Sequence, residues 1–270
     1  MNLQHIKATT LSDAWFQTLF RILEEGSVFT IDRGSYAGQK RLEFDWITLH
    51  IQHPSVRPLL PQIEAHHNIP NPVADDYLDE YMPYLMTREL KDGESYTYGQ
   101  RICGATFEQK IIELQLYKSE AFKEILIDDE DFWNNDKVIE TQGDQSFFSQ
   151  VEAMIWTYKN KGYRNNQMIL QVGQPTDMML KDPPCLRHID TRIQNGKLHF
   201  YPYFRSWDLW GGLPANLAGI QMLKEYCAAE IGVEDGEMIA SSKGLHIYDY
   251  SFDLAKCLRM RDDMQLKQGD

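Results

Sequence analysis

The residues most able to do chemistry lie close together in the last third of the chain. They are Cys185, Arg205, Ser206, Asp208, Asn216, His246 and Tyr248. A thiolate can attack an electron-poor ring, an arginine and a serine can hold a phosphate, and a primary amide can donate and accept hydrogen bonds at once. Together they could bind a phosphorylated heterocycle and attack it.

Cys185 differs from the other cysteines in what precedes it. Pro183 and Pro184 exclude a regular helix or a central strand there, so we expect Cys185 on a loop that enters the strand over 187–193. A lone cysteine is more often a small core residue, and we expect Cys227, in an apolar stretch, to be one. The four cysteines include no C-x-x-C pair, which favours reduced thiols in a cytoplasmic protein and predicts no metal site.

Composition limits the class of protein. A chain of 270 residues with 43% hydrophobic residues is typical of a soluble globular protein with a substantial core. The net charge of −13 argues against a surface that wraps nucleic acid, but it allows a small phosphate pocket of converging arginines. The chain has no leader pattern, and no run of apolar residues approaches the length of a membrane span, so we expect an intracellular protein that needs no membrane.

Hydrophobic periodicity predicts helices and strands in mixed order. Expected helices cover residues 11–25, 77–86, 106–126, 147–161 and 213–230, and expected strands cover 28–31, 41–51, 167–172, 187–193, 197–204 and 237–250. Asn195-Gly196 predicts a two-residue hairpin turn. The apolar positions change parity between Trp46 and Ile47, which predicts a bulge or a kink. Without a βαβ repeat, a G-x-G-x-x-G or a P-loop, this order indicates one α+β domain over 1–270.

The region from Pro184 to Tyr248 resembles the thymidylate synthase family. That family carries its nucleophilic cysteine after a proline, then R-S-x-D and G-x-P-x-N, and finally H-x-Y. In this chain Arg205 follows Cys185 by twenty residues, and the later motifs fit without a gap. The resemblance implies a bent mixed β-sheet covered by helices, and a homodimer.

The resemblance also implies conversion of dUMP to dTMP. The Cys185 thiolate would add to C6 of the uracil ring, after which C5 would accept a one-carbon unit. Arg205 would lower the thiol pKa and grip the 5′-phosphate, to which Ser206 would donate a further hydrogen bond. The amide of Asn216 would accept from N3–H and donate to O4, which is the pattern of uracil and not of cytosine.

Four other residues complete the site that the resemblance implies. His246 and Tyr248 would bind the deoxyribose 3′-hydroxyl. Asp208, with Gly212 nearby, would hold the pterin of 5,10-methylene-tetrahydrofolate or of a related methylene-pterin, the co-substrate. Without the resemblance, Arg205 and Asp208 could equally form a surface ion pair, and His246 could be a core histidine.

The upstream motifs are shorter. The segment around Arg33 is similar to the family's D-R-x-G loop, whose arginine closes on the phosphate. The segment around Tyr98 resembles V-Y-G-x-Q, whose tyrosine helps to order the water used in proton removal from C5. Glu64 aligns with the family's glutamate, a proton relay near O4, or is a solvated acid. The family's paired arginines should fall at 165–166, where only Arg164 is close.

The chain departs from the family pattern in two stretches. Residues 106–145 look like an insertion, and residues 251–270 form a short tail in place of a longer one that contains β-structure. The longer tail excludes water, so that the methylene at C5 takes hydride rather than hydroxide. The first alternative is therefore a deoxypyrimidine hydroxymethylase acting on dUMP. The second is a nucleotide-binding protein without turnover.

Overall fold

A computed structural model of the chain describes residues 1–32, 36–74, 76–104, 127, 129–143 and 145–269. Its helices are α1 (Leu11–Glu25), α2 (Tyr77–Leu85), α3 (Tyr98–Cys103), α5 (Glu130–Trp133), α6 (Gln150–Lys161), α7 (Gly212–Ile231) and α8 (Phe252–Leu258), with short 3-10 turns η1 (Ala65–His67), η4 (Pro175–Met179) and η5 (Asp249–Ser251). Its strands are β1 (Leu3–Ala8), β2 (Ser27–Thr30), β3 (Lys40–Ile51), β4 (Ile139–Gln142), β5 (Gln145–Phe148), β6 (Ile169–Gln171), β7 (Leu186–Gln194), β8 (Lys197–Phe204), β9 (Trp207–Asp208), β10 (Glu234–Tyr248) and β11 (Lys267–Gln268).

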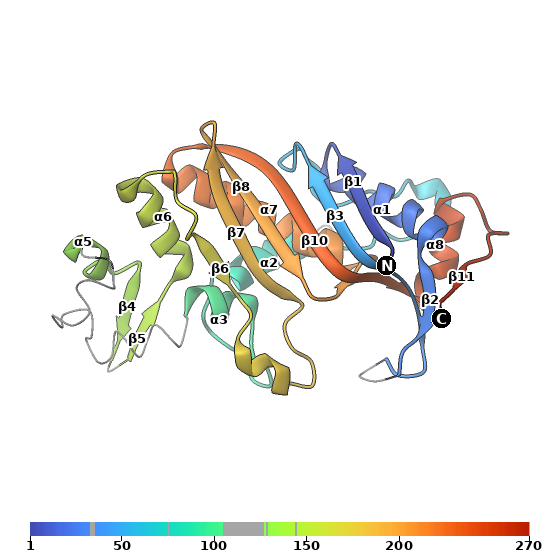
Figure 1. Cartoon of the computed structure of the whole chain (residues 1–270), viewed down its shortest axis with the longest axis horizontal. Helices are drawn as coiled ribbons and strands as arrows, with labels where there is room; N and C mark the ends of the chain where they lie inside the picture. The colour runs from blue at the N-terminus through green and yellow to red at the C-terminus, as the bar shows by residue number, and fades with distance from the viewer. Residues whose placement is uncertain (33–35, 75, 105–126, 128, 144, 270) are drawn as a thin grey trace.

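Within the described residues, nine strands form one mixed sheet. Its order is β11-β2-β3-β10-β8-β7-β6, with β1 paired to β3 and β9 paired to β10. Helices α1, α2 and α7 lie behind the sheet in Figure 1, and the face toward the viewer carries no described helix over β3, β10, β8 and β7. The main core lies between the sheet and these helices. None of the described helices is long and apolar enough to cross a membrane.

The sheet bends along a line that crosses three neighbouring strands. In β3 the buried positions change parity after Asp45, as the sequence predicts, while the register with β10 runs on unbroken. In β10 the change falls at Gly244, whose φ of 62° suits glycine. The feature is therefore a kink rather than a bulge. Arg205 and Ser206 separate β8 from β9 at the same level of the sheet, so the bend positions both side chains.

The hairpin between β7 and β8 confirms the predicted turn. Asn195 and Gly196 both have positive φ, 53° and 73°, as a type I′ turn requires. At the other end of the same pair, the register shifts between Leu186 and His188. The shift leaves Arg187, two residues after Cys185, as the extra residue of a β-bulge. Bulges re-aim neighbouring side chains and are common beside active sites.

Most of the predicted elements are confirmed. The helices over 11–25, 77–86 and 213–230 correspond to α1, α2 and α7, and each expected strand has a counterpart in the large sheet. The helix expected from residue 147 begins only at Gln150, because residues 147 and 148 belong to β5. The helix expected over 106–126 lies outside the described residues. Strand β1 was not predicted, because its apolar positions do not alternate regularly.

Part of the predicted insertion forms a small unit of its own beside α6. Strands β4 and β5 pair as an antiparallel hairpin, and α5 precedes them in the chain. A second hydrophobic cluster holds this unit together: Phe132, Val138, Ile139, Ala153 and Trp156. In Figure 1 the unit lies at the end of the molecule opposite β2 and β11. The described part of this segment therefore packs in a cluster separate from the main core.

Candidate active site

Cys185 lies at the end of the loop that leads from η4 into β7, as the two prolines predict. Its backbone oxygen accepts a hydrogen bond from the N–H of Arg205 at 2.8 Å, which fixes the end of the loop against the bend. The side chain is half-buried. Cys227 is fully buried on α7, as expected for a core cysteine. Cys185 thus combines a fixed backbone with a thiol that is not sealed in the core.

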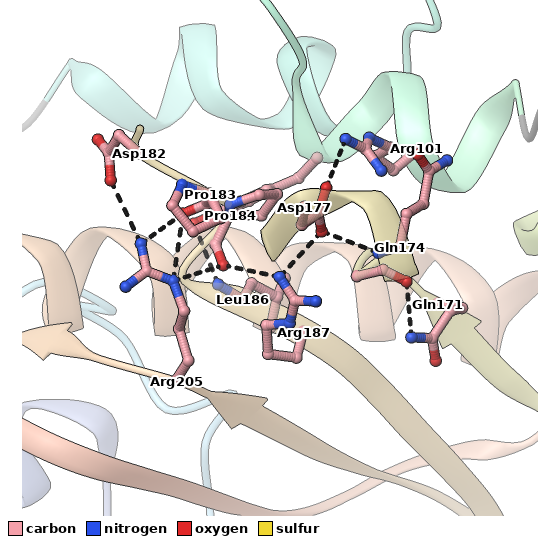
Figure 2. A network of polar contacts seen from close by, with 12 residues as sticks. Arg101, Gln171, Gln174, Asp177, Asp182, Pro183, Pro184, Leu186, Arg187 and Arg205 are labelled. Carbon is pink, nitrogen blue, oxygen red and sulfur yellow. Dashed lines mark hydrogen bonds and ion pairs between the residues drawn. The ribbon is translucent and has the colours of Figure 1, made fainter. Parts of the chain in front are cut away.

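The guanidinium of Arg205 reaches back to the loop that carries Cys185. Its Nε donates to the carbonyl oxygens of Pro183 (3.3 Å) and Pro184 (3.2 Å), and its Nη2 donates to Pro183 at 2.5 Å (Figure 2). The same Nη2 pairs with the Asp182 carboxylate at 3.2 Å, so the carboxylate beside Arg205 is Asp182 and not Asp208. Its Nη1 donates to no residue that the structure describes. That group remains available to an anion.

Burial raises the pKa of the Cys185 thiol above its ordinary value. The positive charge of Arg205 lowers this pKa, as the sequence predicts, and Arg187 adds a smaller effect in the same direction. The nearby carboxylates of Asp182 and Asp208 raise the pKa again. Because desolvation outweighs the arginines, the thiol form predominates at neutral pH. A nucleophilic role for Cys185 would therefore require that the thiol first lose its proton.

Tyr98 connects the cysteine loop to helix α3. Its hydroxyl accepts a hydrogen bond from the backbone N–H of Leu186, the residue after Cys185, at 3.3 Å. The following Gly99 is required by close packing, because a Cβ there would lie 2.2 Å from the carbonyl oxygen of Tyr84. Burial, with the thiol nearby, raises the pKa of the Tyr98 hydroxyl far above its ordinary value. The hydroxyl therefore keeps its proton and can also act as a donor.

The buried carboxylate of Asp177 stabilises the loop that leads to Cys185. Asp177, only 2% exposed, pairs with Arg101 at 2.9 Å and with Arg187 at 2.9 Å (Figure 2). The Nη1 of Arg187 also donates to the carbonyl oxygen of Pro184 at 3.4 Å. Gly173 allows this arrangement, because a Cβ there would lie 2.5 Å from the Arg187 guanidinium. Two arginines, Arg187 and Arg205, thus bind the carbonyl group directly before Cys185.

A cavity of about 610 Å³ lies beside this loop. It is lined by Tyr77, Glu80, Tyr81, Tyr84, Lys91, Gly93, Glu94, Ser95, Tyr96, Tyr98, Asp182 and Asn216. Its size suits a ring-containing ligand. Cys185 is not among the described residues that line it. Tyr98 joins the two, since it lines the cavity and binds the peptide group that follows Cys185.

The amide of Asn216 faces the cavity and is oriented by two aromatic side chains. The indole Nε1 of Trp207 donates to Asn216 Oδ1 at 3.1 Å, and Asn216 Nδ2 donates to the Tyr81 hydroxyl at 2.8 Å. Because an indole N–H can only donate, it fixes which side of the amide is the oxygen. One lone pair on Oδ1 and one hydrogen on Nδ2 remain for a ligand.

Asp208 caps the start of α7. Its Oδ2 accepts from the N–H groups of Gly211 (3.1 Å) and Gly212 (2.9 Å), and its Oδ1 accepts from Trp210 (3.2 Å). A Cβ at Gly212 would lie 3.2 Å from the Cβ of Asp208, so the glycine permits this close approach. The carboxylate therefore has a structural task. One lone pair of Oδ1 remains for a hydrogen-bond donor of a ligand.

A second cavity, of about 370 Å³, opens at the bend of the sheet. It is lined by Arg41, Glu43, Asp45, Arg205, Ser206, Lys243 and Gly244. Arg41 pairs with Glu43 at 2.6 Å, which offsets the charge of one of its basic residues. Arg205 and Ser206 thus lie together in a small polar hollow, next to the bend that separates β8 from β9.

His246 and Tyr248 lie near the end of β10. His246 is 3% exposed; its Nδ1 contacts the carbonyl oxygen of Gly244 at 2.8 Å, and its Nε2 is buried without a partner among the described residues. Burial lowers the pKa of the His246 imidazole, so the ring is neutral at neutral pH. Tyr248 stacks between Tyr36 and Tyr250, with ring centres 4.5 Å and 5.8 Å away. His246 is therefore buried, and one of its ring nitrogens has no partner among the described residues.

Two predicted residues, Glu64 and Arg164, do not join this group, and a third cannot be placed. Glu64 is 80% exposed and pairs with His66 at 3.1 Å, and it is not among the described residues of either cavity. Arg164 is exposed on the loop before β6, four residues before Met168, whose carbonyl oxygen accepts from the N–H of Thr191 on β7. From Leu186 to Thr191 the strand spans roughly 17 Å, so Arg164 lies far from Cys185 within one chain. Arg33 lies outside the described residues.

Sequence reasoning missed four residues that position the site. They are Tyr81, Trp207, Asp177 and Arg187. Tyr81 belongs to a stripe of tyrosines on α2 with Tyr77 and Tyr84, a helical spacing that could have drawn attention to it. Trp207 is the variable residue of the R-S-x-D motif. Asp177 and Arg187 carry no signal, because only the fold brings them together.

Comparison with known proteins identifies the class to which this fold and site belong. A family model described as thymidylate synthase matches residues 96–268, and the chain belongs to that family. Among provisionally named thymidylate synthases, it is 29% identical to one from Methanosarcina acetivorans over 251 residues, which cover 93% of this chain and 92% of the relative. It is 28% identical to one from Methanosarcina barkeri over 253 residues, 93% of this chain and 92% of the relative.

Proposed function

We propose that the protein converts dUMP to dTMP, with Cys185 as the nucleophile. The observation that carries this proposal is the hydrogen bond between Tyr98 and the peptide N–H after Cys185, at the wall of the cavity that Asn216 faces. This hydrogen bond connects the proposed nucleophile to a cavity large enough for a pyrimidine and a second ring. Membership in the thymidylate synthase family gives the reaction class, a one-carbon transfer.

The nucleotide is held at the bend of the sheet. The free Nη1 of Arg205 and the hydroxyl of Ser206 bind its 5′-phosphate, supported by their place in one polar hollow. Arg33 is the further cation that we expect to close on this phosphate. His246, through its unpartnered Nε2, and Tyr248 bind the 3′-hydroxyl of the sugar. The base then reaches Cys185 and Asn216.

The thiolate of Cys185 adds to C6, which makes C5 nucleophilic, and Asn216 reads O4 and N3–H. C5 accepts the one-carbon unit and then loses its proton. The proton passes to a water molecule that the Tyr98 hydroxyl orders, and the raised pKa of this hydroxyl supports the role, because a hydroxyl that keeps its proton can donate a hydrogen bond to that water. Loss of Cys185 from C6 releases the product. Glu64 stays a predicted proton relay, although its side chain lies in solvent in this structure.

A reduced pterin that carries a methylene group is the co-substrate. It supplies the one-carbon unit and the hydride that converts this unit to methyl. The polar atom that fits its pterin ring is Asp208 Oδ1, which has one lone pair beyond the helix cap. Gly212 leaves room beside that carboxylate. The tyrosine-lined cavity is the space that remains for the donor next to the nucleotide.

The active unit is a homodimer joined through the face of the sheet on which no described helix lies. That face carries half-buried aromatic side chains: Trp46 and Tyr203 stack with ring centres 5.7 Å apart, and His188 lies 5.5 Å from Tyr203. Aromatic surfaces of this kind are typical of interfaces. Arg164 lies on the loop before β6, far from the end of β7 next to Cys185. It can therefore bind the phosphate only in the site of the partner subunit.

The test is incubation of the protein with dUMP tritiated at C5 and methylene-tetrahydrofolate, with release of tritium to water as the measurement. We expect release in the wild type and none in Cys185→Ser. Mass spectrometry of the product then distinguishes a methyl from a hydroxymethyl group. If the protein binds dUMP but releases no tritium, it is neither a methyltransferase nor a hydroxymethylase, and the nucleotide-binding alternative without turnover holds.

A further inference from the structure

We propose that Tyr81 determines which pyrimidine the site accepts, by acting with Asn216 as a pair of hydrogen-bond donors toward the group at C4. The inference rests on the proposed function and extends it. Of these two residues, only Asn216 belongs to the motifs that resemble the family. The contact between Tyr81 and Asn216 joins helices α2 and α7 across 135 residues of sequence.

The first step concerns the direction of the Asn216 amide. Trp207 donates to its Oδ1, and Trp207 is itself fixed: it is 2% exposed and stacks on Phe204 with ring centres 4.0 Å apart. The amide nitrogen must therefore point toward Tyr81. One of its hydrogens goes to the Tyr81 hydroxyl, and the other is left for the cavity.

The second step concerns the proton of the Tyr81 hydroxyl. Its oxygen accepts from Asn216, and no described residue accepts the hydrogen that it carries. Tyr81 and Asn216 both line the cavity, so that hydrogen is available there. Burial raises the pKa of Tyr81 well above its ordinary value, and the hydroxyl stays protonated across the physiological range. The cavity is thus offered two adjacent donors.

Two adjacent donors distinguish the two common pyrimidines. The O4 of uracil is a carbonyl oxygen with two lone pairs and can accept from both Asn216 and Tyr81. The 4-amino group of cytosine only donates, so it leaves both donors unpaired and brings hydrogens against them. Buried groups that lose their partners on binding the wrong ligand give strong discrimination.

The Tyr81 ring is held closely enough for this task. It stacks between Tyr77 and Tyr84, with ring centres 5.5 Å and 5.8 Å away. It also lies directly on Gly219, where a Cβ would come within 2.0 Å of the ring. Gly219 and Asn216 are one helical turn apart on α7. The same surface of α7 therefore positions both donors.

The experiment measures the dissociation constants of dUMP and dCMP by calorimetry for the wild type and for Tyr81→Phe. We expect the preference for dUMP to fall about tenfold in Tyr81→Phe, because one hydrogen bond is lost. Tyr226→Phe is the matched control. It removes the hydroxyl of a tyrosine on α7, which donates to Glu152 on α6 at 3.0 Å, and neither Tyr226 nor Glu152 lines the cavity.

A second variant covers the case in which Tyr81→Phe does not fold. Gly219→Ala keeps the hydroxyl but displaces the ring, and it should weaken the preference in the same direction. An unchanged preference in folded Tyr81→Phe, or in Gly219→Ala if only that variant folds, would overturn the inference and leave the proposed function intact. If the wild type itself fails to prefer dUMP and releases no tritium, the proposed function fails as well.

Discussion

The hydroxyl of Tyr98 lies 3.3 Å from the backbone nitrogen of Leu186 and accepts its hydrogen bond. This contact ties helix α3 to the strand that begins directly after Cys185. It therefore links the backbone next to Cys185 to a residue that lines the larger cavity.

Replacement of Tyr98 by phenylalanine should lower kcat about 100-fold, because small displacements of a reacting group and loss of the hydroxyl that orders the proton-accepting water each have effects of this size. The dissociation constant of dUMP should change little, since Tyr98 is not assigned to its phosphate, sugar or base. Calorimetry and steady-state rates separate the two effects. A loss of binding that matches the loss of rate would contradict this role.

Alkylation of Cys185 should depend steeply on pH. Burial raises the thiol pKa, so the thiolate is the minor species below the ordinary pKa of about 8.5 and grows about tenfold for each pH unit. The rate of iodoacetamide labelling, measured by mass spectrometry of the Cys185 peptide, should rise throughout pH 7 to 8.5. Arg205→Ala should slow it at every pH. A plateau below pH 7.5 would indicate a thiol activated in the free protein.

Asp177→Ala should destabilise the protein by about 3 kcal/mol, because it leaves Arg101 and Arg187 buried or half-buried without their counterion. Urea unfolding followed by circular dichroism gives the free energy. Asp182→Ala is the matched control: that carboxylate pairs with Arg205 but is 83% exposed, and its loss should cost less than about 1 kcal/mol. Equal effects would argue against the buried network.

The dimer with shared sites predicts complementation between two defective proteins. Cys185→Ser lacks the nucleophile, and Arg164→Ala lacks the arginine that the partner donates. After unfolding and refolding together, mixed dimers contain one site with both residues intact, and activity should exceed that of either protein alone. Activity no higher than the average of the separate samples would contradict the assignment of Arg164 to the partner's site.

Local sequence features predicted much of the fold. The apolar stripe of residues 11–25 became α1, and Asn195-Gly196 became the hairpin turn, because both depend on neighbouring residues alone. The change in parity of the apolar positions within residues 41–51 predicted the bend in β3. The two prolines before Cys185 predicted correctly that it lies at the end of a loop that enters a strand.

The rest depends on contacts between distant segments. Asn216 meets Tyr81 from 135 residues away, and Asp177 meets Arg101 from 76 residues away. No local pattern encodes these pairs. The thiol pKa illustrates the same limit: the sequence indicated the arginine beside Cys185, but burial, which only the folded chain determines, has the larger effect.

The central claim is that Cys185 adds to C6 of a uracil nucleotide, and trapping of that bond tests it most directly. 5-Fluoro-dUMP carries fluorine in place of the hydrogen that must leave C5, so the reaction should stop with the nucleotide and the one-carbon donor attached. After incubation with methylene-tetrahydrofolate, mass spectrometry should find this adduct on the peptide that contains Cys185, and Cys185→Ser should carry none. An adduct on Cys103 or Cys257, or no adduct at all, would contradict the account.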